Sequence, residues 1–417
     1  MVTDRIWPAL DYSRVPYCLY HDAEIYEREQ QRIFQGPVWN YLGLEAEIPN
    51  PGDFRASWVG ETPVVFNRDQ GGAVKAFVNR CAHRGALVRR ELSGNAREHI
   101  CIYHQWCYGL DGGLTAIPFR RGVRGKGGLD ASFDMGAHGL RPLRVGIVDG
   151  VVFGTLADDA EPLEDYLGPP ILAQLRRLFD RPVRVLGYNR QRIRANWKLY
   201  AENTRDNYHA SLLHEFLVTF GLDRSTQVGG VRMDARHRHN ITWAEADSDT
   251  DEFAREAYAS VRVRNDYLSL QEPALVAFHP EHGDKLNLAV TSVFPSAVFV
   301  QISNSLAIRQ IRPRGVDQFE VFQTMIGYQD DPPEMIFHRL RQANLVGPAG
   351  LVSMEDGEAI EIAHRASKPD PDGASVIELG GGGVISDRDY RVTDVPLRGF
   401  WSYYAELLGI EPAGAVR

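Results

Sequence analysis

Two short cysteine and histidine pairs constrain this chain more than any other feature of its sequence. A single residue separates Cys81 from His83, and after a gap of seventeen residues Cys101 and His104 form the second pair. The first residues of the chain lack the apolar core of a signal peptide. Because thiols stay reduced in proteins that are not exported, metal binding explains these pairs better than disulfide formation.

The two pairs fit an iron–sulfur cluster or a zinc site. A Rieske [2Fe–2S] centre takes two thiolates on one iron and two imidazoles on the other. A zinc site places the same four groups in one tetrahedron, but paired zinc ligands usually stand two or more residues apart. The single-residue gap between Cys81 and His83 therefore favours the cluster. The expected cluster ligands are Cys81, His83, Cys101 and His104.

A second ligand pattern lies in residues 202–214. His209 and His214 stand five positions apart, and Asp206 precedes His209 by about one helical turn. Two imidazoles and a carboxylate are suitable ligands for a first-row metal. Five residues on a regular helix rotate by about 140°, so the rings can meet at one metal only if the helix is locally distorted. The alternative is a pair of core or surface histidines on an amphipathic helix.

The composition excludes several classes of protein. The 417 residues, of which 44% are hydrophobic and 10% aromatic, suit two or three domains with large cores. The net charge of −9 argues against nucleic acid as a partner, because phosphate binding needs clustered Lys and Arg. No apolar run of about 18 residues predicts a membrane span. We therefore expect a cytoplasmic protein with neither a nucleic-acid nor a membrane partner.

The chain divides into three expected regions. Residues 1–37 predict an extended entry and a helix that packs on a later domain, with Asp22 as its N-cap. Residues 38–156 alternate short β-branched runs with turn signals, which predicts a small all-β domain around the cysteine and histidine pairs. Residues 157–417 begin with an acidic linker and form a larger domain. Within it, the alternation over residues 286–312 predicts strands of a sheet.

Three further expectations concern the larger domain. Strand alternation places Arg309 on a more polar face, together with Phe299 and Gln301. Residues 236–251 are polar and predict a flexible loop that gates the mouth of a cavity. The glycines at 380–383 predict a mobile turn rather than a phosphate cradle.

Several cysteines and histidines fall outside the two ligand patterns. Cys18 and Cys107 are interpreted as small buried side chains. The remaining histidines interpreted as structural are His237, His239, His279 and His282.

Together, the two patterns resemble the large (alpha) subunit of Rieske non-heme iron aromatic ring-hydroxylating oxygenases. The family pattern Glu-Asn-x-x-Asp-x-Tyr-His-x-x-x-x-His matches residues 202–214, and the likeness covers nearly the whole chain. Gln105 stands where many members carry glycine. The stretches that are similar to the branch acting on aromatic carboxylates are residues 103–106, 118–122, 342–351, 353–357 and 398–401. That branch contains the anthranilate, salicylate, halobenzoate and terephthalate oxygenases.

The resemblance implies an α+β fold, in which an all-β Rieske domain precedes a helix-grip (Bet v 1-like or START-like) catalytic domain with a curved antiparallel sheet. It also implies a mononuclear Fe(II) held by His209, His214 and one carboxylate, which leaves coordination positions open for dioxygen. Asp356 occupies the family's position for that carboxylate. Spacing alone does not distinguish Asp356 from its neighbour Glu355.

Asp206 resembles the family's bridging carboxylate. In the family, the cluster of a neighbouring subunit lies near the iron, and this aspartate joins a ligand histidine on each side. The expected partners are therefore His209 and the partner subunit's His104. A simpler role, orienting His209 within one chain, is compatible with the bridge.

A carboxylate substrate in an apolar cavity needs a charged donor, because unpaired burial is costly. Strand parity and the resemblance make Arg309 the first candidate and Arg398 the second, with solvent-facing arginines as the alternative. Asn203 lines the pocket or caps a helix.

The expected activity is that of a terminal oxygenase. Such an enzyme uses O2 and electrons relayed from NAD(P)H to hydroxylate an aromatic carboxylate, and we expect cis-dihydroxylation. The alternatives are a monooxygenase on the same substrates and a Rieske electron carrier without catalysis. The resemblance implies a reductase and a ferredoxin as electron donors, a small beta subunit, and an alpha3 or alpha3beta3 assembly.

Overall fold

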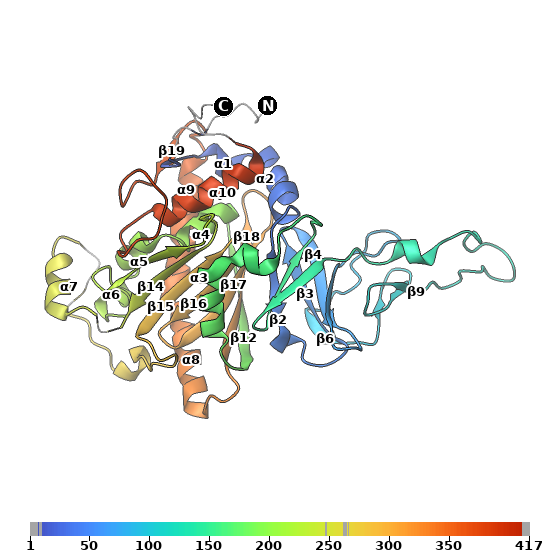
Figure 1. The fold of residues 1–417 in the computed structure, drawn as a ribbon, viewed down its shortest axis with the longest axis horizontal. Coiled ribbons are helices and arrows are strands. Elements are labelled where there is room, and N and C mark those ends of the chain that lie inside the picture. The colour runs from blue at the N-terminus through green and yellow to red at the C-terminus, as the bar shows by residue number, and fades with distance from the viewer. Residues whose placement is uncertain (1–6, 8–10, 247, 262–264, 266, 411–417) are drawn as a thin grey trace. The chain divides into compact units, whose positions relative to one another are not determined.

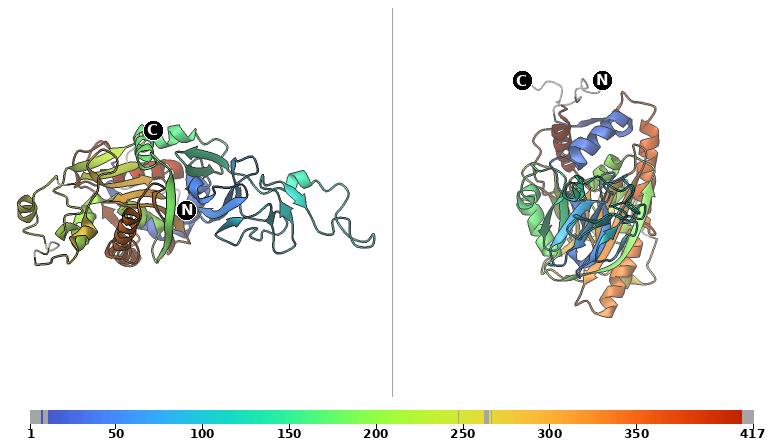
Figure 2. Two further views of the ribbon diagram at one scale, coloured as in Figure 1. Left: turned by 90° about the horizontal axis from the view of Figure 1, so that it is seen from below. Right: turned by 90° about the vertical axis from the view of Figure 1, so that its right-hand side faces the viewer.

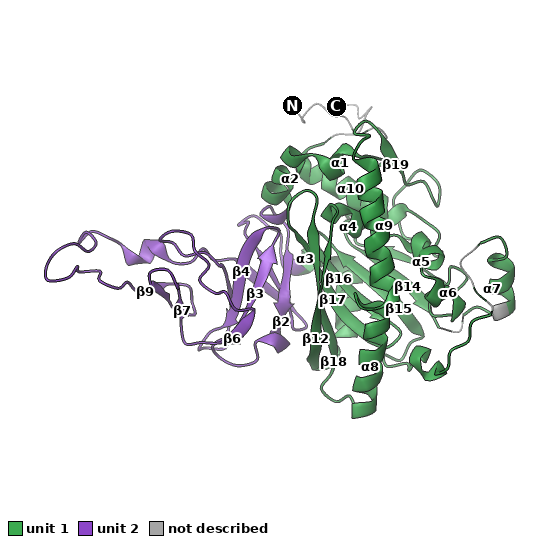
Figure 3. Cartoon of the chain, turned by 180° about the vertical axis from the view of Figure 1, so that it is seen from behind, with its two compact units in different colours: residues 1–33, 164–417 green, residues 34–163 purple. Residues whose placement is uncertain are grey.

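The described residues form two compact units. The computed structural model describes residues 7, 11–246, 248–261, 265 and 267–410. Unit 2 consists of residues 34–163, and unit 1 combines residues 1–33 with residues 164–417 (Figure 3). Within the described part of the chain, no helix is both long and apolar enough to cross a membrane.

Unit 2 is built from short antiparallel strands, as the sequence predicts. Its strands are β2 (Asn40–Leu44), β3 (Asp53–Val59), β4 (Thr62–Arg68), β5 (Val74–Val78), β6 (Ser93–Asn95), β7 (His99–Ile100), β8 (Cys107–Tyr108), β9 (Leu114–Ala116), β10 (Arg144–Val148) and β11 (Val151–Thr155). Among the described residues they pair in the orders β5-β4-β3-β6, β10-β11-β2 and β7-β8-β9. Short 3₁₀ turns span Glu45–Glu47 and Met135–His138. Cys81 and Cys101 belong to the hydrophobic core of this unit, together with Trp106 and Tyr108.

The N-terminal segment belongs to unit 1. It contains β1 (Arg14–Pro16), α1 (Cys18–His21), α2 (Ala23–Glu29) and a π-helical turn at Gln30–Phe34. Asp22 is the N-cap of α2, because its Oδ1 accepts hydrogen bonds from the backbone N–H groups of Glu24 and Ile25. The predicted cap is therefore confirmed.

An antiparallel sheet forms the centre of unit 1. Its strands are β12 (Val183–Ile193), β13 (Gly229–Met233), β14 (Asn240–Glu245), β15 (Leu286–Val293), β16 (Ala297–Ile302), β17 (Ser305–Pro313) and β18 (Phe319–Tyr328). The described strands lie in the order β12-β18-β17-β16-β15-β14-β13 (Figure 1). Strands predicted within residues 286–312 are confirmed as β15, β16 and β17.

Helices cover both faces of this sheet. They are α3 (Leu163–Leu178), α4 (Trp197–Asn203), α5 (Asn207–Leu213), α6 (Glu215–Thr219), α7 (Asp251–Ala257), α8 (Pro333–Val346), α9 (Leu351–Ser367) and α10 (Val395–Leu408), with a 3₁₀ turn at Pro273–Val276. Arg177 of α3 donates a hydrogen bond to Gln301 on one face, and Arg309 donates one to Tyr200 of α4 on the other. Figure 2 shows the sheet between α3 on one side and α8 and α9 on the other. The short strand β19 (Ala374–Val376) pairs with β1 outside this sheet.

The prediction that Arg309 shares a face of the sheet with Phe299 and Gln301 is wrong. Strands β16 and β17 form a hairpin in which Val298 pairs with Arg309 and Val300 with Ala307, so these residues share a face. Phe299 pairs with Ile308 on the opposite face. Because the chain reverses at a two-residue turn, odd-numbered positions change face between the two strands. Arg309 therefore lies beside Val298 and Val300 on one side and beside Gln323 of β18 on the other.

The flexible loop predicted at residues 236–251 is also wrong. Asn240–Glu245 is strand β14, which pairs with β13 on one side and β15 on the other. Ile241 and Thr242 are β-branched residues inside this strand, and such residues favour strands over loops. His239 is buried just before β14, where its Nε2 donates to the carbonyl of Tyr166.

Two cysteines outside the ligand pattern differ in burial. Cys18 is buried, as predicted, whereas Cys107 is partly exposed on β8 and contacts the carbonyl of Gln105. The prediction of a buried Cys107 is therefore wrong.

Candidate metal centres and substrate cavity

The cysteine and histidine pairs of unit 2 lie on two tight turns. Gly85 N donates to the carbonyl of Cys81, and Gln105 N donates to the carbonyl of Cys101, so each turn closes next to its cysteine. The rings of His83 and His104 lie with their centroids 4.5 Å apart. The structure thus brings together both histidines that the spacing selected.

The surroundings of these turns fit an iron–sulfur cluster. The Nδ1 atom of His83 is buried and has no hydrogen-bond partner within the described residues, which leaves a lone pair for a metal. Burial raises the pKa of the Cys101 thiol, so a thiolate there needs a cation beside it. The hydroxyl of Tyr108 lies 3.1 Å from the sulfur of Cys81. Tyr108 is not among the site residues expected from the sequence, because nothing in its spacing relates it to the ligands.

The second ligand pattern contains the helix distortion that its spacing requires. Asp206 caps α5, since its Oδ1 accepts from the backbone N–H groups of Tyr208 and His209. The helix ends at Leu213, and His214 adopts non-helical angles of φ −92° and ψ 81° before α6 begins. The break lets the rings of His209 and His214 approach one another, with centroids 5.4 Å apart.

Asp356 of α9 completes this group. Its Oδ1 lies 3.3 Å from Nε2 of His209 and 3.2 Å from Nε2 of His214. One ligand atom from each of these three residues lies within 4.8 Å of the other two. Helix α9 reaches this position because it packs against α4, which directly precedes the histidine segment. Two imidazoles and one carboxylate around a common point can hold a mononuclear iron.

Each histidine has a carboxylate on its outer nitrogen. Nδ1 of His214 forms a 2.7 Å hydrogen bond with Glu355, whereas Nδ1 of His209 lies 3.2 Å from Asp206 without the alignment of a hydrogen bond. Outer carboxylates of this kind fix the tautomer of a metal-binding histidine, so that its other nitrogen faces the metal. Spacing alone did not distinguish Asp356 from Glu355 as the carboxylate ligand. The geometry favours Asp356, because it faces both inner nitrogens whereas Glu355 faces an outer one.

The charge of this group favours a bound cation. Burial alone would lower the pKa of His209, but the neighbouring carboxylates of Asp206 and Asp356 raise it to about 10. Burial alone would raise the pKa of Asp356, but the neighbouring imidazoles of His209 and His214 lower it. The carboxylates therefore stabilise a positive charge at this position even without a metal. Nδ2 of Asn203 lies 3.1 Å from both His209 Nε2 and Asp356 Oδ1, so a hydrogen-bond donor already faces the proposed ligand atoms.

A cavity adjoins the three side chains. Its apolar walls come from helices and from one face of the sheet. The lining residues are Asn203, Thr204, Asp206, Asn207, His209, Ala210, His214, Leu217, Asp223, Thr242, Leu288, Val290, Val300, Ile302, Arg309, Val352 and Asp356. Arg309 is 6% exposed, and its Nε is buried without a hydrogen-bond partner in the described part of the chain. The cavity thus contains a cation with an unused donor.

Arg398 lies elsewhere. It does not line this cavity, and its guanidinium donates to the carbonyls of Gly381 and Gly383. Arg398 therefore stabilises the turn at glycines 380–383. Of the two candidate arginines, Arg309 is the one that lines the cavity.

The chain matches two families in sequence. Residues 38–126 match the Rieske [2Fe-2S] domain, and residues 179–406 match the ring hydroxylating alpha subunit (catalytic domain). The chain belongs to the ring-hydroxylating alpha-subunit family. Its cofactors are accordingly a Rieske [2Fe–2S] cluster and a mononuclear iron, and it is a ring-hydroxylating oxygenase rather than an electron carrier. As an alpha subunit of such an oxygenase, it works in an oligomer with electron-transfer partners.

Similar proteins cover nearly the whole chain. The large subunit of anthranilate 1,2-dioxygenase from Burkholderia cepacia is 44% identical over 98% of this chain and 96% of its own length. The alpha 2 subunit of the terephthalate 1,2-dioxygenase terminal oxygenase component from Comamonas sp. is 43% identical over 97% and 98%. The large oxygenase component of salicylate 5-hydroxylase from Ralstonia sp. is 41% identical over 97% of each chain.

The fold has known relatives as well. A naphthalene 1,2-dioxygenase structure with indole bound in the active site matches with a TM-score of 0.79, at 22% identity, over 98% of this chain and 95% of that one. The predicted combination of an all-β Rieske domain with a helix-grip catalytic domain is confirmed.

Proposed function

We propose that this oxygenase subunit hydroxylates an aromatic carboxylate, and that Arg309 binds the carboxylate. The observation that carries the proposal is the buried, unused Nε of Arg309 in the wall of the cavity next to His209, His214 and Asp356. The three similar proteins named above support the substrate class, because their names specify anthranilate, terephthalate and salicylate.

We propose the following metal ligands. The cluster is held by Cys81, His83, Cys101 and His104, and the mononuclear iron by His209, His214 and Asp356. When bound, the cluster supplies single electrons and the mononuclear iron supplies oxygen activation beside the aromatic ring. The protein then has to position the ring, keep water out and hold the ligand histidines in one tautomer.

Arg309 positions the substrate in this scheme. Its Nη1 donates to the hydroxyl of Tyr200 at 3.1 Å, which fixes the guanidinium from the helix side. Val298 and Val300 of β16 are apolar neighbours on the same face, and Gln323 of β18 is a neutral one, so Arg309 is the cationic anchor on this wall. A carboxylate bound by Arg309 directs the attached ring into the apolar remainder of the cavity.

Substitution of Arg309 tests this role. Arg309→Leu should raise KM for the carboxylate substrate about 10- to 100-fold, because a hydrogen bond to a charged group contributes roughly 1.5–3 kcal/mol. The KM for the matching carboxamide should change much less. Arg309→Lys keeps the charge, so its KM for the carboxylate should lie between those of wild type and Arg309→Leu. Equal KM values for the carboxylate in wild type and Arg309→Leu would remove Arg309 from the substrate site.

The outcome of oxygenation is proposed to be cis-dihydroxylation. Two of the similar proteins are named dioxygenases and one is named a hydroxylase, so monohydroxylation is the alternative. Product analysis with anthranilate, salicylate, terephthalate and 2-halobenzoates distinguishes them. A cis-diol that carries two atoms from ¹⁸O2 supports the proposal, and a phenol with one labelled atom contradicts it.

Electron delivery is proposed to cross between subunits. Asp206 already contacts His209 through Nδ1, and its second contact would be the partner subunit's His104. We further propose a reductase and a ferredoxin as donors, a small beta subunit, an alpha3 or alpha3beta3 assembly and a cytoplasmic location. The reduced state of the cysteine thiols that the cluster needs supports that location.

A further inference from the structure

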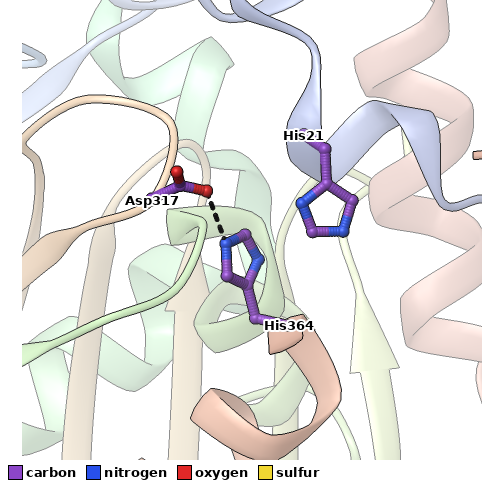
Figure 4. Close-up of side chains that lie close together, drawn as sticks. All are labelled: His21, Asp317 and His364. Atoms are coloured by element: carbon purple, nitrogen blue, oxygen red, sulfur yellow. Dashed lines mark hydrogen bonds and ion pairs between the residues drawn. The ribbon is translucent and has the colours of Figure 1, made fainter. Parts of the chain in front are cut away.

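A second group of metal-type ligands lies apart from the cavity. His21 ends α1, Asp317 lies between β17 and β18, and His364 lies near the end of α9. One ligand atom of each residue lies within 4.8 Å of the other two (Figure 4). The three residues come from segments far apart in the sequence, and none of them lines the substrate cavity.

The hydrogen bonds around the two rings determine where their protons are. The hydroxyl of Ser367 donates to the carbonyl of His364, so it accepts from Nε2 of His21 at 2.9 Å. Asp317 is a carboxylate whose pKa is lowered, first by its hydrogen bond to Lys368, and it accepts from Nε2 of His364 at 2.8 Å. In the neutral form, both rings therefore carry their proton on Nε2.

The inner nitrogens are left without partners. Nδ1 of His21 and Nδ1 of His364 are both buried, and neither has a hydrogen-bond partner in the described residues. The ring centroids lie 4.5 Å apart, and Figure 4 shows a nitrogen of each ring directed toward the other ring. His364 is only 4% exposed. Two buried lone pairs this close together need a hydrogen-bond donor or a cation as a partner.

A proton is a poor partner at neutral pH. Burial and the neighbouring His364 lower the pKa of His21 to about 4. Burial also lowers the pKa of His364, although Asp317 opposes the shift. Neutral imidazole is the form that binds metal ions, so these rings are ready to act as ligands without losing a proton.

We propose that Nδ1 of His21 and Nδ1 of His364 bind a first-row transition-metal ion such as Zn²⁺. Asp317 and Ser367 accept from the outer N–H groups, which is the usual way in which metal-binding histidines are oriented. Imidazole nitrogens suit Zn²⁺ or Cu²⁺, whereas Mg²⁺ and Ca²⁺ prefer oxygen ligands. The cationic side chains of Arg365 and Lys368 nearby further disfavour ions that are held by charge alone.

Solvent would complete the coordination. Asp317 and His364 line a surface groove, so water lies close to the two buried Nδ1 atoms. The ion would link α1 to α9, the helix that also carries Glu355 and Asp356. Binding would therefore stabilise the N-terminal segment on the catalytic unit, by a free energy that grows with the logarithm of the free metal concentration above the dissociation constant.

Metal counting on the iron-loaded oxygenase tests the proposal. The protein is incubated with a small excess of Zn²⁺, passed through a desalting column and analysed for zinc and iron. Wild type should retain about one more zinc per chain than His21→Gln or His364→Gln, with unchanged iron in all three. His338→Gln is the matched control, because His338 and His279 form another ring pair, 5.1 Å apart, outside the two groups of metal-type ligands. It should retain zinc like wild type.

Equal zinc retention in wild type and His21→Gln overturns the proposal. Zinc uptake matched by iron loss in every variant also overturns it, since the zinc would then occupy the iron site. Thermal melting provides a second measurement if His364→Gln folds poorly: Zn²⁺ should raise the melting temperature of wild type and His338→Gln but not of His21→Gln. None of these measurements depends on oxygenase activity, so they stay separate from tests of the substrate proposal.

Discussion

The two proposed iron-binding regions are assembled in opposite ways. The cluster turns place Cys81, His83, Cys101 and His104 within one short stretch, among short strands of an all-β unit. The mononuclear site needs α5 and α9 to meet, and His214 is 141 residues from the carboxylate of Glu355 that orients it. The first site is encoded by local turns, whereas the second depends on how distant helices pack on a sheet.

They also differ in charge. The mononuclear site gathers three carboxylates, Asp206, Glu355 and Asp356, around two imidazoles. The described cluster turns offer buried thiols and partly exposed imidazoles instead, with the hydroxyl of Tyr108 beside one sulfur. At the mononuclear site, removing a side chain should therefore act mainly by removing negative charge that compensates the charge of the metal. At the cluster, it should act mainly by disturbing the geometry of the turns.

The largest effect is expected from Asp356→Ala. This change removes the one proposed carboxylate ligand, so iron should fall from about three to about two per chain and product formation should be lost. The visible absorption of the cluster should remain, because its ligands lie in the other unit. Glu358→Ala, an exposed position on the same helix, is the control and should keep its iron. Loss of the cluster spectrum in Asp356→Ala would show that the two sites are not independent.

Asp206→Asn should have the next largest effect. Asparagine can still cap α5, but the substitution removes the negative charge that lies beside His209 Nδ1. Turnover should fall about 10- to 100-fold or more, with both metals still bound, since outer partners of metal ligands contribute at this level. Steady-state rates and iron content measured together check this. Near-normal turnover would rule out Asp206 as a bridge for electrons.

A smaller effect concerns stability near the mononuclear site. Glu202 is partly buried, and this burial raises its pKa to about 7, although Tyr20 and Trp401 donate hydrogen bonds to it. The folded protein therefore binds a proton that the unfolded chain loses above pH 4.5. Stability should fall as the pH rises from about 4.5 to 7, by up to about 3 kcal/mol.

Glu202→Gln should flatten this pH dependence. Melting temperatures of wild type and variant, compared at pH 5 and pH 8, measure it. Glu358→Gln is the exposed control and should melt like wild type at both values. A difference in melting temperature between wild type and Glu202→Gln that is the same at pH 5 and pH 8 would contradict the raised pKa of Glu202.

The smallest effect is expected at the cluster turn. Gln105 has a φ of +54°, a left-handed conformation that costs most residues about 1 kcal/mol and glycine nothing. This explains why a glycine is suited to the position. Gln105→Gly should keep the cluster and change the free energy of unfolding by no more than about 1 kcal/mol, because relief of strain is offset by the freer unfolded chain. Loss of the cluster spectrum would show that the Gln105 side chain supports it.

The sequence predicted those parts of both sites that depend on nearby residues. The cap at Asp22, the strands within residues 286–312 and the helix distortion before His214 all follow from local patterns. Two predictions failed where pairing between strands decides the outcome. Strand parity counted along the chain gives Arg309 the wrong neighbours, because the β16–β17 hairpin reverses the parity. The polar residues around Asn240 hid a strand with partners on both sides.

The sequence by itself determined the chemistry: which thiols, imidazoles and carboxylates are available, and which of them stand at ligand spacing. Only the tertiary structure decided how the distant residues are used. It turned Asp356 rather than Glu355 toward the inner nitrogens, placed Arg309 in the cavity and Arg398 at the glycine turn, and brought His21 to His364. The physical reason is that spacing fixes directions within one turn or strand, whereas the direction of a side chain across the core depends on how helices and sheets pack.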